Sequence, residues 1–271
     1  MKQNTWIRQF SKKKWVKHWA GRWHLLNNSL LGYQYTKLLK KDIGSCLEVA
    51  VFISHKHYTV AYLDFSYYKA FGSHLAKKML SNSKQLIYWT NQLMKRTDDI
   101  LGLIKKLKEK RMVTGVDFEK FIDFFYAYGI PHRVIKIVVD ALPEKKLKQF
   151  LPALSKARVY AEPVYAETEG FIEHVSSQIA KSTSYKKDHV LSVTKEEMSR
   201  YWKTHTLPNK QELTKRFDSC AMIYNKGRFQ IFTGKAAKSI EDSVENVGRE
   251  AKDLSGFSAY PGRVSGIARI I

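Results

Sequence analysis

The sequence predicts an α+β fold that is mainly helical, because three kinds of pattern follow one another along the chain. Two apolar runs within residues 46–65 are rich in β-branched and aromatic side chains, as β-strands are. From residue 73 to about residue 183, apolar side chains recur every three or four positions, which is typical of packed helices. A hairpin pattern follows at Asn225–Gly227. We expect an N-terminal basic and aromatic region with β-strands (1–72), a bundle of long helices (73–183) and a connector (184–255).

Composition limits the class of protein. The chain has 271 residues, of which 44% are hydrophobic, enough for a sizeable core. It has no apolar run of about 18 residues that would form a membrane-spanning helix. The first residues lack the apolar segment of a secretory signal. Cys46 and Cys220 lie far apart, as expected for buried thiols in a reducing compartment. We therefore expect a cytoplasmic protein with no membrane partner.

The formal net charge of +22 is the most unusual feature of the composition. A surface this basic attracts nucleic acid or another polyanion. The lysines, however, are spread in pairs along the chain, for example at Lys40–Lys41 and Lys186–Lys187. We interpret most of them as the solvated faces and ends of helices.

The basic N-terminal segment holds the candidate binding residues. Trp15, Trp19 and Trp23 recur at four-residue spacing, which predicts that they share one face of a helix. Rings interleaved with lysine and arginine suit stacking on single-stranded nucleic acid. Packing on a core or a partner domain is the interpretation that we favour. Trp19, Arg22 and Trp23 are the candidate substrate-binding residues, since Gly21–Arg22 fits the start of a ligand-facing loop.

The two predicted N-terminal strands are Cys46–Ile53 and Tyr58–Phe65. Ser54–His57 lies between them as a turn, which we expect to be exposed. His55 and His57 would point the same way from an extended chain. Two histidines without a third ligand nearby make a poor zinc site, so we predict no metal there.

The helical region begins, by pattern, at Ser73, a good N-cap residue. One long amphipathic helix is predicted from there to near Lys110. A second helix spans Asp117–Tyr128, carries four phenylalanines and ends at Gly129. Pro131 begins a third helix that is apolar nearly all round. The aromatic stripe of the second helix is expected to be core rather than the lining of a ligand pocket.

In the next segment, residues 154–175, apolar and small side chains recur at spacings that alternate between three and four residues. This pattern predicts a seam between two packed helices. Pro163 interrupts it, so we expect a kink or a break there. The same segment holds the main acidic concentration of the chain. It lacks the Glu-x-x-His motifs of di-metal bundles, so we predict no metal site. The seam residues are Leu154, Ala157, Ala161, Val164, Thr168, Phe171 and Val175, and the acidic residues are Glu162, Glu167, Glu169 and Glu173.

The connector has clear helix starts. Thr194 and Glu197 have the spacing of a capping box, with Val193 and Met198 as the flanking apolar pair. Asn209 repeats the arrangement after Pro208. A hairpin with its turn at Asn225–Gly227 follows, and then a short helix over 235–247.

The last stretch, residues 256–271, resembles the start of another domain. Pro261–Gly262 is a turn signal, and Val264, Gly266, Ala268 and Ile270 alternate as in a strand. This stretch is similar to the first strand of the swivelling phosphohistidine domain of the PEP-utilising enzymes, which include phosphoenolpyruvate synthase, pyruvate phosphate dikinase and rifampicin phosphotransferase. The resemblance extends back to about residue 188 through the Thr194 capping box and the hairpin, so we expect a chain truncated within its mobile domain.

The resemblance implies a phosphotransfer role. In that family an ATP-grasp domain phosphorylates a histidine of the swivelling domain, which carries the phosphoryl group to pyruvate or another acceptor. The family's phosphohistidine would lie beyond Ile271, so no catalytic residue is carried over. The resemblance implies no cofactor bound by this chain, although the complete system would need ATP and Mg. The expected function is a helical acceptor-binding or docking region, whose partners are the ATP-grasp half and the rest of the swivelling domain. The alternative is a basic helical protein that binds nucleic acid.

Overall fold

The structure is a computed structural model that describes residues 13–82 and 84–245. The strand expected over 256–271 lies outside the described residues. Within them, the predicted α+β fold, mainly α, is confirmed, since a five-stranded antiparallel sheet packs against a set of long helices. None of the described helices is long and apolar enough to cross a membrane.

The sheet joins two hairpins that are far apart in the sequence. Its strands lie in the order β1-β3-β2-β4-β5, and every neighbouring pair is antiparallel. β2 pairs with β4 at the centre, where Phe52 lies opposite Met222. Both predicted hairpins are present, and positive φ angles at Lys56–His57 and Lys226–Gly227 form their tight turns. The strands are β1 (Trp15–Arg22), β2 (Val49–His55), β3 (Tyr58–Asp64), β4 (Cys220–Asn225) and β5 (Arg228–Thr233).

Both faces of the central strands are buried. Val49, Val51 and Ile53 of β2 contact α12 (Gly234–Glu245) through one apolar cluster. Ala50 and Phe52 point to the opposite face and belong to the main core. Because both faces of β2 are covered, its sequence is a continuous apolar run instead of an alternation.

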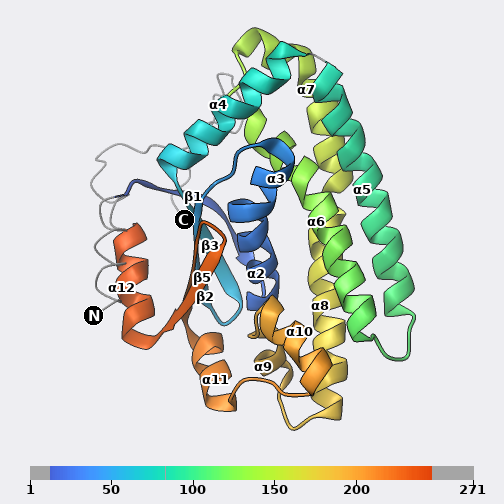
Figure 1. The fold of residues 1–271 in the computed structure, drawn as a ribbon, viewed down its shortest axis with the longest axis vertical. Helices are drawn as coiled ribbons and strands as arrows, with labels where there is room; N and C mark the ends of the chain where they lie inside the picture. The colour runs from blue at the N-terminus through green and yellow to red at the C-terminus, as the bar shows by residue number, and fades with distance from the viewer. Residues whose placement is uncertain (1–12, 83, 246–271) are drawn as a thin grey trace, which may run out of the picture.

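The remaining helices lie on the side of the sheet away from α12, in two layers (Figure 1). The inner layer is α2 (Leu25–Tyr33), the π-helix η1 (Gln34–Leu38) and α3 (Leu39–Ile43). The outer layer is a bundle, and three short helices close one end of the molecule. The bundle helices are α4 (Phe65–Ser81), α5 (Lys84–Lys108), α6 (Gly115–Val138), α7 (Glu144–Ala161) and α8 (Pro163–Ser182), and the short ones are α9 (Lys187–Leu191), α10 (Lys195–Thr204) and α11 (Lys210–Asp218).

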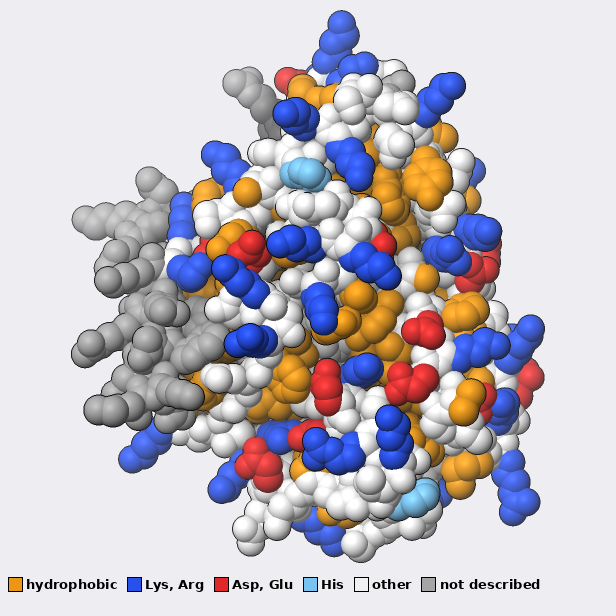
Figure 2. Space-filling model, in the orientation of Figure 1, with side chains coloured by type: hydrophobic (Ala, Val, Ile, Leu, Met, Phe, Trp, Pro, Cys, Tyr) orange, Lys and Arg blue, Asp and Glu red, His pale blue; other side chains and the backbone are white. Residues whose placement is uncertain are grey.

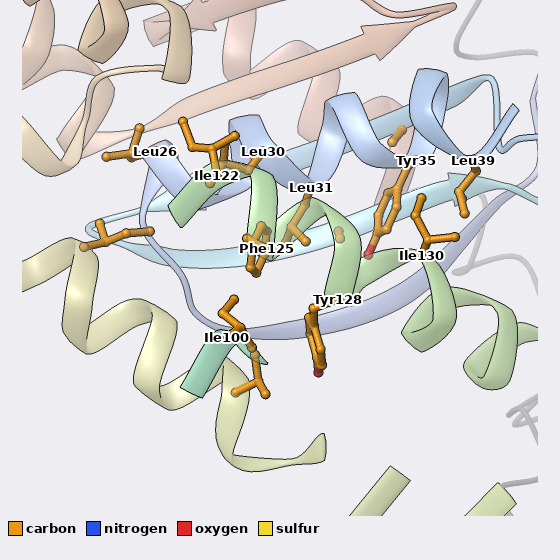
Figure 3. Packing of buried hydrophobic residues seen from close by; sticks show 14 of the residues in the cluster. Leu26, Leu30, Leu31, Tyr35, Leu39, Ile100, Ile122, Phe125, Tyr128 and Ile130 are labelled. Atoms are coloured by element: carbon orange, nitrogen blue, oxygen red, sulfur yellow. The ribbon is translucent and has the colours of Figure 1, made fainter. Parts of the chain in front are cut away.

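The two helical layers share one core. Leu26, Leu30, Leu31, Tyr35 and Leu39 line one side of α2, η1 and α3 at spacings of about one turn, and α6 lies across from them (Figure 3). All five side chains are at most 1% exposed. The row therefore ties the sheet layer to the bundle, and Tyr35 places a phenol within it.

The tryptophan segment is a strand, so the helix predicted from the four-residue spacing is wrong. β1 pairs with β3 along its length, and the register slips between Lys17 and Trp19. Such a bulge leaves His18 without a partner residue in β3 and turns two consecutive side chains toward one face of the sheet. Trp15 is buried on the α12 side, whereas Trp19 packs with the main core.

The single helix predicted from Ser73 to near Lys110 is also wrong, because two helices occupy this stretch. Asp64 caps α4 by accepting hydrogen bonds from the backbone N–H groups of Ser66 and Tyr67. The backbone becomes extended at Asn82, and α5 follows. The apolar period continues across the break because both helices pack on the same core.

Helix α6 runs through both Gly129 and Pro131, where the sequence predicted an end and a new start. A Cβ atom at Gly129 would lie 1.7 Å from Nε2 of Gln34, so this glycine allows η1 to approach the helix and does not end it. Proline within a helix costs about 3 kcal/mol. Each fully buried aliphatic side chain contributes about 1.5–3 kcal/mol. Val134, Ile135 and Val138 are all fully buried, so packing outweighs the proline.

Other sequence predictions are confirmed. Every predicted seam residue from Leu154 to Val175 is buried, and Pro163 separates α7 from α8 as the first residue of the latter. Thr194 and Glu197 form the capping box of α10, and Asn209 caps α11.

Candidate functional site

A cleft of about 710 Å³ lies between α4 and the segment that joins α6 to α7. We call it the α4–α6 cleft. Phe65, Ile137, Leu142 and Leu147 supply much of its apolar wall. An apolar concave surface with a few polar groups is the usual form of a small-molecule site.

The local sequence sets the width of the cleft. A Cβ atom at Gly72 of α4 would lie 3.3 Å from Cβ of Ala141, so the glycine allows close approach at this point. Pro143 follows with an extended backbone and leads into α7. The chain therefore turns sharply between the two helices, and the cleft forms beside this turn.

A tyrosine–aspartate pair forms the main polar feature of the cleft. The Tyr68 hydroxyl donates to Oδ2 of Asp140 at 2.5 Å. Burial, and then this hydrogen bond, raise the pKa of Tyr68, so the phenol keeps its proton and acts as the donor. A carboxylate accepts more than one hydrogen bond. Asp140, which is exposed, therefore has acceptor capacity for a ligand hydroxyl.

Tyr68 also connects the cleft to a group of basic side chains deeper in the protein. Its ring lies 5.6 Å from that of His18, the residue at the bulge of β1. We use the name basic cluster for His18, His132, Arg133, Lys136 and Arg158. Burial, and then the charges of Arg133, Lys136 and Arg158, lower the pKa of both histidines well below the usual value, so both are neutral at pH 7.

Lys136 is the cluster member that titrates near neutral pH. Burial, followed by the charges of Arg133 and Arg158, lowers its pKa to about 7. Asp140, four residues further along the chain and just beyond the end of α6, acts in the opposite direction. Burial first, and then the positive charge of the cluster, therefore destabilise the lysine cation.

Arg133 is the innermost member and is 2% exposed. Its Nη2 donates to the Tyr165 hydroxyl at 2.8 Å, and that hydroxyl lies 3.1 Å from Nδ1 of His132. The guanidinium carbon lies 4.6 Å from the ring centre of Tyr35 and 5.7 Å from that of Tyr165. Nε has no hydrogen-bond partner among the described residues.

Trp19 and Trp23, predicted as substrate-binding residues, border the basic cluster but do not line the cleft. Nε1 of Trp19 donates to the Tyr35 hydroxyl at 3.1 Å, and the Trp23 ring lies edge-on to Tyr165 at 4.9 Å. Arg22, the third predicted residue, is exposed, and its charge acts on His57 and Glu173 instead. The structure therefore separates Arg22 from the two tryptophans.

The turn predicted as exposed is only partly so. His55 is exposed and its Nε2 lies 2.8 Å from Oε1 of Glu241. His57 is buried instead, with Nε2 3.3 Å from Oδ1 of Asp188 and its ring 4.6 Å from that of His24. The tight turn points the two side chains in different directions. Burial, and then His24, lower the pKa of His57 to about 4.

The acidic concentration of α8 forms ion pairs with basic side chains. Glu169 contacts His24, Glu173 lies 2.7 Å from Nζ of Lys187, and Glu167 lies 2.7 Å from Nζ of Lys108. Within the described ranges, no group of three or more His, Cys, Asp or Glu residues is placed to hold a metal ion.

Sequence reasoning missed Tyr68, Asp140 and Arg133. None of them belongs to a motif, and they come together only because α4, β1 and α6 meet in space. The one local signal was the proline-interrupted apolar pattern around Arg133, where a charged residue stands in a helix that is otherwise apolar. Comparisons of the chain with protein-family models, with curated proteins and with solved structures find no match.

Proposed function

We propose that this chain supplies the helical acceptor-binding region of a PEP synthase-like phosphotransferase and that the acceptor binds in the α4–α6 cleft. The observation that carries the proposal is the Tyr68–Asp140 pair within an apolar cleft of about 710 Å³. The apolar wall suits the body of an acceptor, and the carboxylate suits its hydroxyl. The similarity of residues 188–271 to the connector of PEP-utilising enzymes supports the phosphotransfer context.

The proposal assigns the chemistry to other parts of the system. The sequence has no Gly-rich phosphate loop, so ATP and Mg belong to an ATP-grasp domain or protein. The phosphohistidine belongs to the swivelling domain. This chain would hold the acceptor while that domain delivers the phosphoryl group, so its contribution is orientation of the acceptor.

Nucleic-acid binding, the alternative, has less support from the packing of the tryptophans. Trp15 is buried, and Trp19 and Trp23 pack against the main core, so their faces are not free for stacking on bases. Lysine and arginine side chains are spread over the face seen in Figure 2 and do not gather in one block.

The acceptor-binding proposal is tested by blocking the cleft. Ligand-observed NMR would screen a set of small uncharged aromatic alcohols against the wild-type chain and the Leu147→Trp variant, in which the larger ring fills the cleft. We expect hits with the wild type that Leu147→Trp loses. Val116→Trp is the matched control, because Val116 is 81% exposed and lies outside the cleft. The absence of hits, or hits that Leu147→Trp retains, would overturn the proposal.

The proposal that phosphoryl transfer takes place on other domains is tested separately. The chain alone, incubated with labelled ATP or labelled PEP, should neither hydrolyse the nucleotide nor gain label. A labelled histidine in this chain would show that the phosphoryl carrier lies within these residues and would contradict the assignment.

A further inference from the structure

Arg133 is a buried cation without an anionic partner. It is 2% exposed, and no described Asp or Glu forms an ion pair or hydrogen bond with it. Its one hydrogen bond goes to a neutral phenol, and Nε has no partner among the described residues. Buried arginines are normally paired, because an uncompensated charge inside a protein is strongly unfavourable.

The aromatic neighbours compensate only part of this cost. Tyr35 and Tyr165 lie within cation–π range of the guanidinium, at 4.6 Å and 5.7 Å. A cation–π contact is worth less than the desolvation of a buried charge. The rings also fix the plane of the guanidinium, so its free Nε–H has a defined direction. Arg133 is thus pre-organised, with donor capacity left over.

The surroundings add positive charge. Lys136 and Arg158 lower the pKa of the same two histidines as Arg133 does. Like Arg133, neither of them forms an ion pair among the described residues. The carboxylates that act on Lys136, Asp140 and Glu162, are both exposed, and Asp140 is bonded to Tyr68. His18, Lys136 and Arg158 are only half-buried, which gives the cluster an edge toward solvent.

From this geometry we infer that the basic cluster is a binding site for a small oxyanion, a phosphate or a carboxylate, held by Nε of Arg133 with Lys136 and Arg158 around it. A guanidinium presents donors in a planar fork that matches the oxygens of such groups. Neutral His18 and His132 can each donate one N–H without adding charge. This site is separate from the proposed acceptor cleft and does not depend on it.

The size of the ligand follows from the packing. Arg133, His132 and Tyr35 are buried among rings, so only a compact group can reach the inner end. A phosphate, a sulfate-sized ion or the carboxylate of a small keto acid fits this description, whereas a polyanion does not. Only one end of a larger molecule would enter, with the rest at the half-buried edge.

The direct test follows the Nε–H signal of Arg133 in a ¹H–¹⁵N spectrum of the full chain, assigned with Arg133→Met. Inorganic phosphate, pyruvate and PEP are the probes. We expect this signal to shift in a saturable way with at least one probe, and the probe that acts identifies phosphate or carboxylate as the recognised group. If it does not shift with any of the three, the inference is overturned.

Affinity measurements provide the second readout. Titration calorimetry with the active probe should show affinity at least about tenfold lower for Arg158→Gln than for the wild type, as expected for the loss of a charge-assisted interaction. Arg158 lies at the edge, so this variant is expected to fold. Arg96→Gln is the matched control, because Arg96 lies outside the cluster, is half-exposed and pairs with Asp99, and this variant should bind as the wild type does. Equal loss in both variants would mean non-specific attraction to a basic protein and would overturn the site. Leu147→Trp should leave this affinity unchanged, so a failure of the cleft proposal can be told apart from a failure of the anion-site inference.

Discussion

Two largely buried arginines of this protein have opposite surroundings. Arg216 of α11 donates two hydrogen bonds to Glu197, at 2.7 Å and 3.1 Å, and a third to Glu212 at 3.1 Å. Arg133 of α6 is more deeply buried and bonds only to the Tyr165 hydroxyl. The difference indicates that Arg216 is a structural cross-link between α10 and α11. Arg133, by contrast, keeps its charge available for something that the described residues do not supply.

The largest effect on stability is expected at Arg216, the arginine that is paired with carboxylates. Arg216→Met leaves the Glu197 carboxylate without its partner in a largely buried position, and we expect the free energy of unfolding to fall by about 3 kcal/mol. Urea unfolding followed by circular dichroism measures it. A loss below about 1 kcal/mol would mean that the bidentate pair is not a cross-link, and the contrast between the two arginines would fail.

The sequence allowed the Arg216 side of this comparison to be predicted in part, but not the Arg133 side. The spacing of Thr194 and Glu197 alone predicts a capping box, because the start of a helix depends on residues that are close in the sequence. The same Glu197 also accepts hydrogen bonds from Arg216. The environment of Arg133 is assembled from η1, α6 and α8, which no local pattern relates.

The features of the fold that depend on nearby residues were likewise predicted, whereas those that depend on residues far apart in the sequence were not. The hairpin turns and the buried face that continues from α7 into α8 follow from nearby residues, and both were predicted. The pairing of β2 with β4 joins segments that are far apart in the chain, and the bulge at His18 depends on how β1 meets β3. The passage of α6 through Gly129 and Pro131 depends on Gln34 and on tertiary burial, so helix propensity alone gave the wrong boundaries.

The second effect concerns pH. Because the pKa of Lys136 is lowered to about 7, its charge is lost as the pH rises through neutrality. If the anion binds only the charged form, its affinity should fall about tenfold between pH 6 and pH 8. Pyruvate is the probe, since its own charge is constant in this range, and calorimetry at both values measures the change. The groups that face Lys136 are Arg133, Arg158, Asp140 and Glu162, with His18 and His132 kept neutral by burial.

The matched variant for the pH effect is Lys136→Met, whose affinity should be lower and should not change over this range. The free energy of unfolding without anion should change with pH in the opposite direction to the anion affinity. Between about pH 7 and the ordinary lysine value, the unfolded chain binds a proton that the folded chain does not, so stability without anion should rise with pH. A pH dependence that survives in Lys136→Met would assign the titration to another group.

A smaller effect is expected at the phenol that holds Arg133. Tyr165→Phe removes the acceptor of the 2.8 Å hydrogen bond while keeping the ring, and should lower the free energy of unfolding by about 1 kcal/mol. Tyr160→Phe is the control, because the Tyr160 hydroxyl donates to Asp98 at the surface and its loss should cost less. Equal small effects in urea unfolding would show that the Arg133–Tyr165 bond contributes nothing.

The smallest effect on stability is expected from Arg133→Met, in spite of its burial. The variant loses cation–π contacts and one hydrogen bond, but it also removes an unpaired charge and leaves no carboxylate unpaired, so the free energy of unfolding should stay within about 1 kcal/mol of the wild type. A loss of about 3 kcal/mol, as at Arg216, would make Arg133 a structural residue.

The most direct test of the central claim compares urea unfolding of the wild type and Arg133→Met with and without a saturating concentration of the probe that shifts the Arg133 signal. A ligand that binds only the folded state raises the free energy of unfolding. The account predicts that this anion stabilises the wild type and leaves Arg133→Met unchanged. Equal stabilisation of the two chains would show that the anion acts on the basic surface in general, and the claim that Arg133 binds an anion would be wrong.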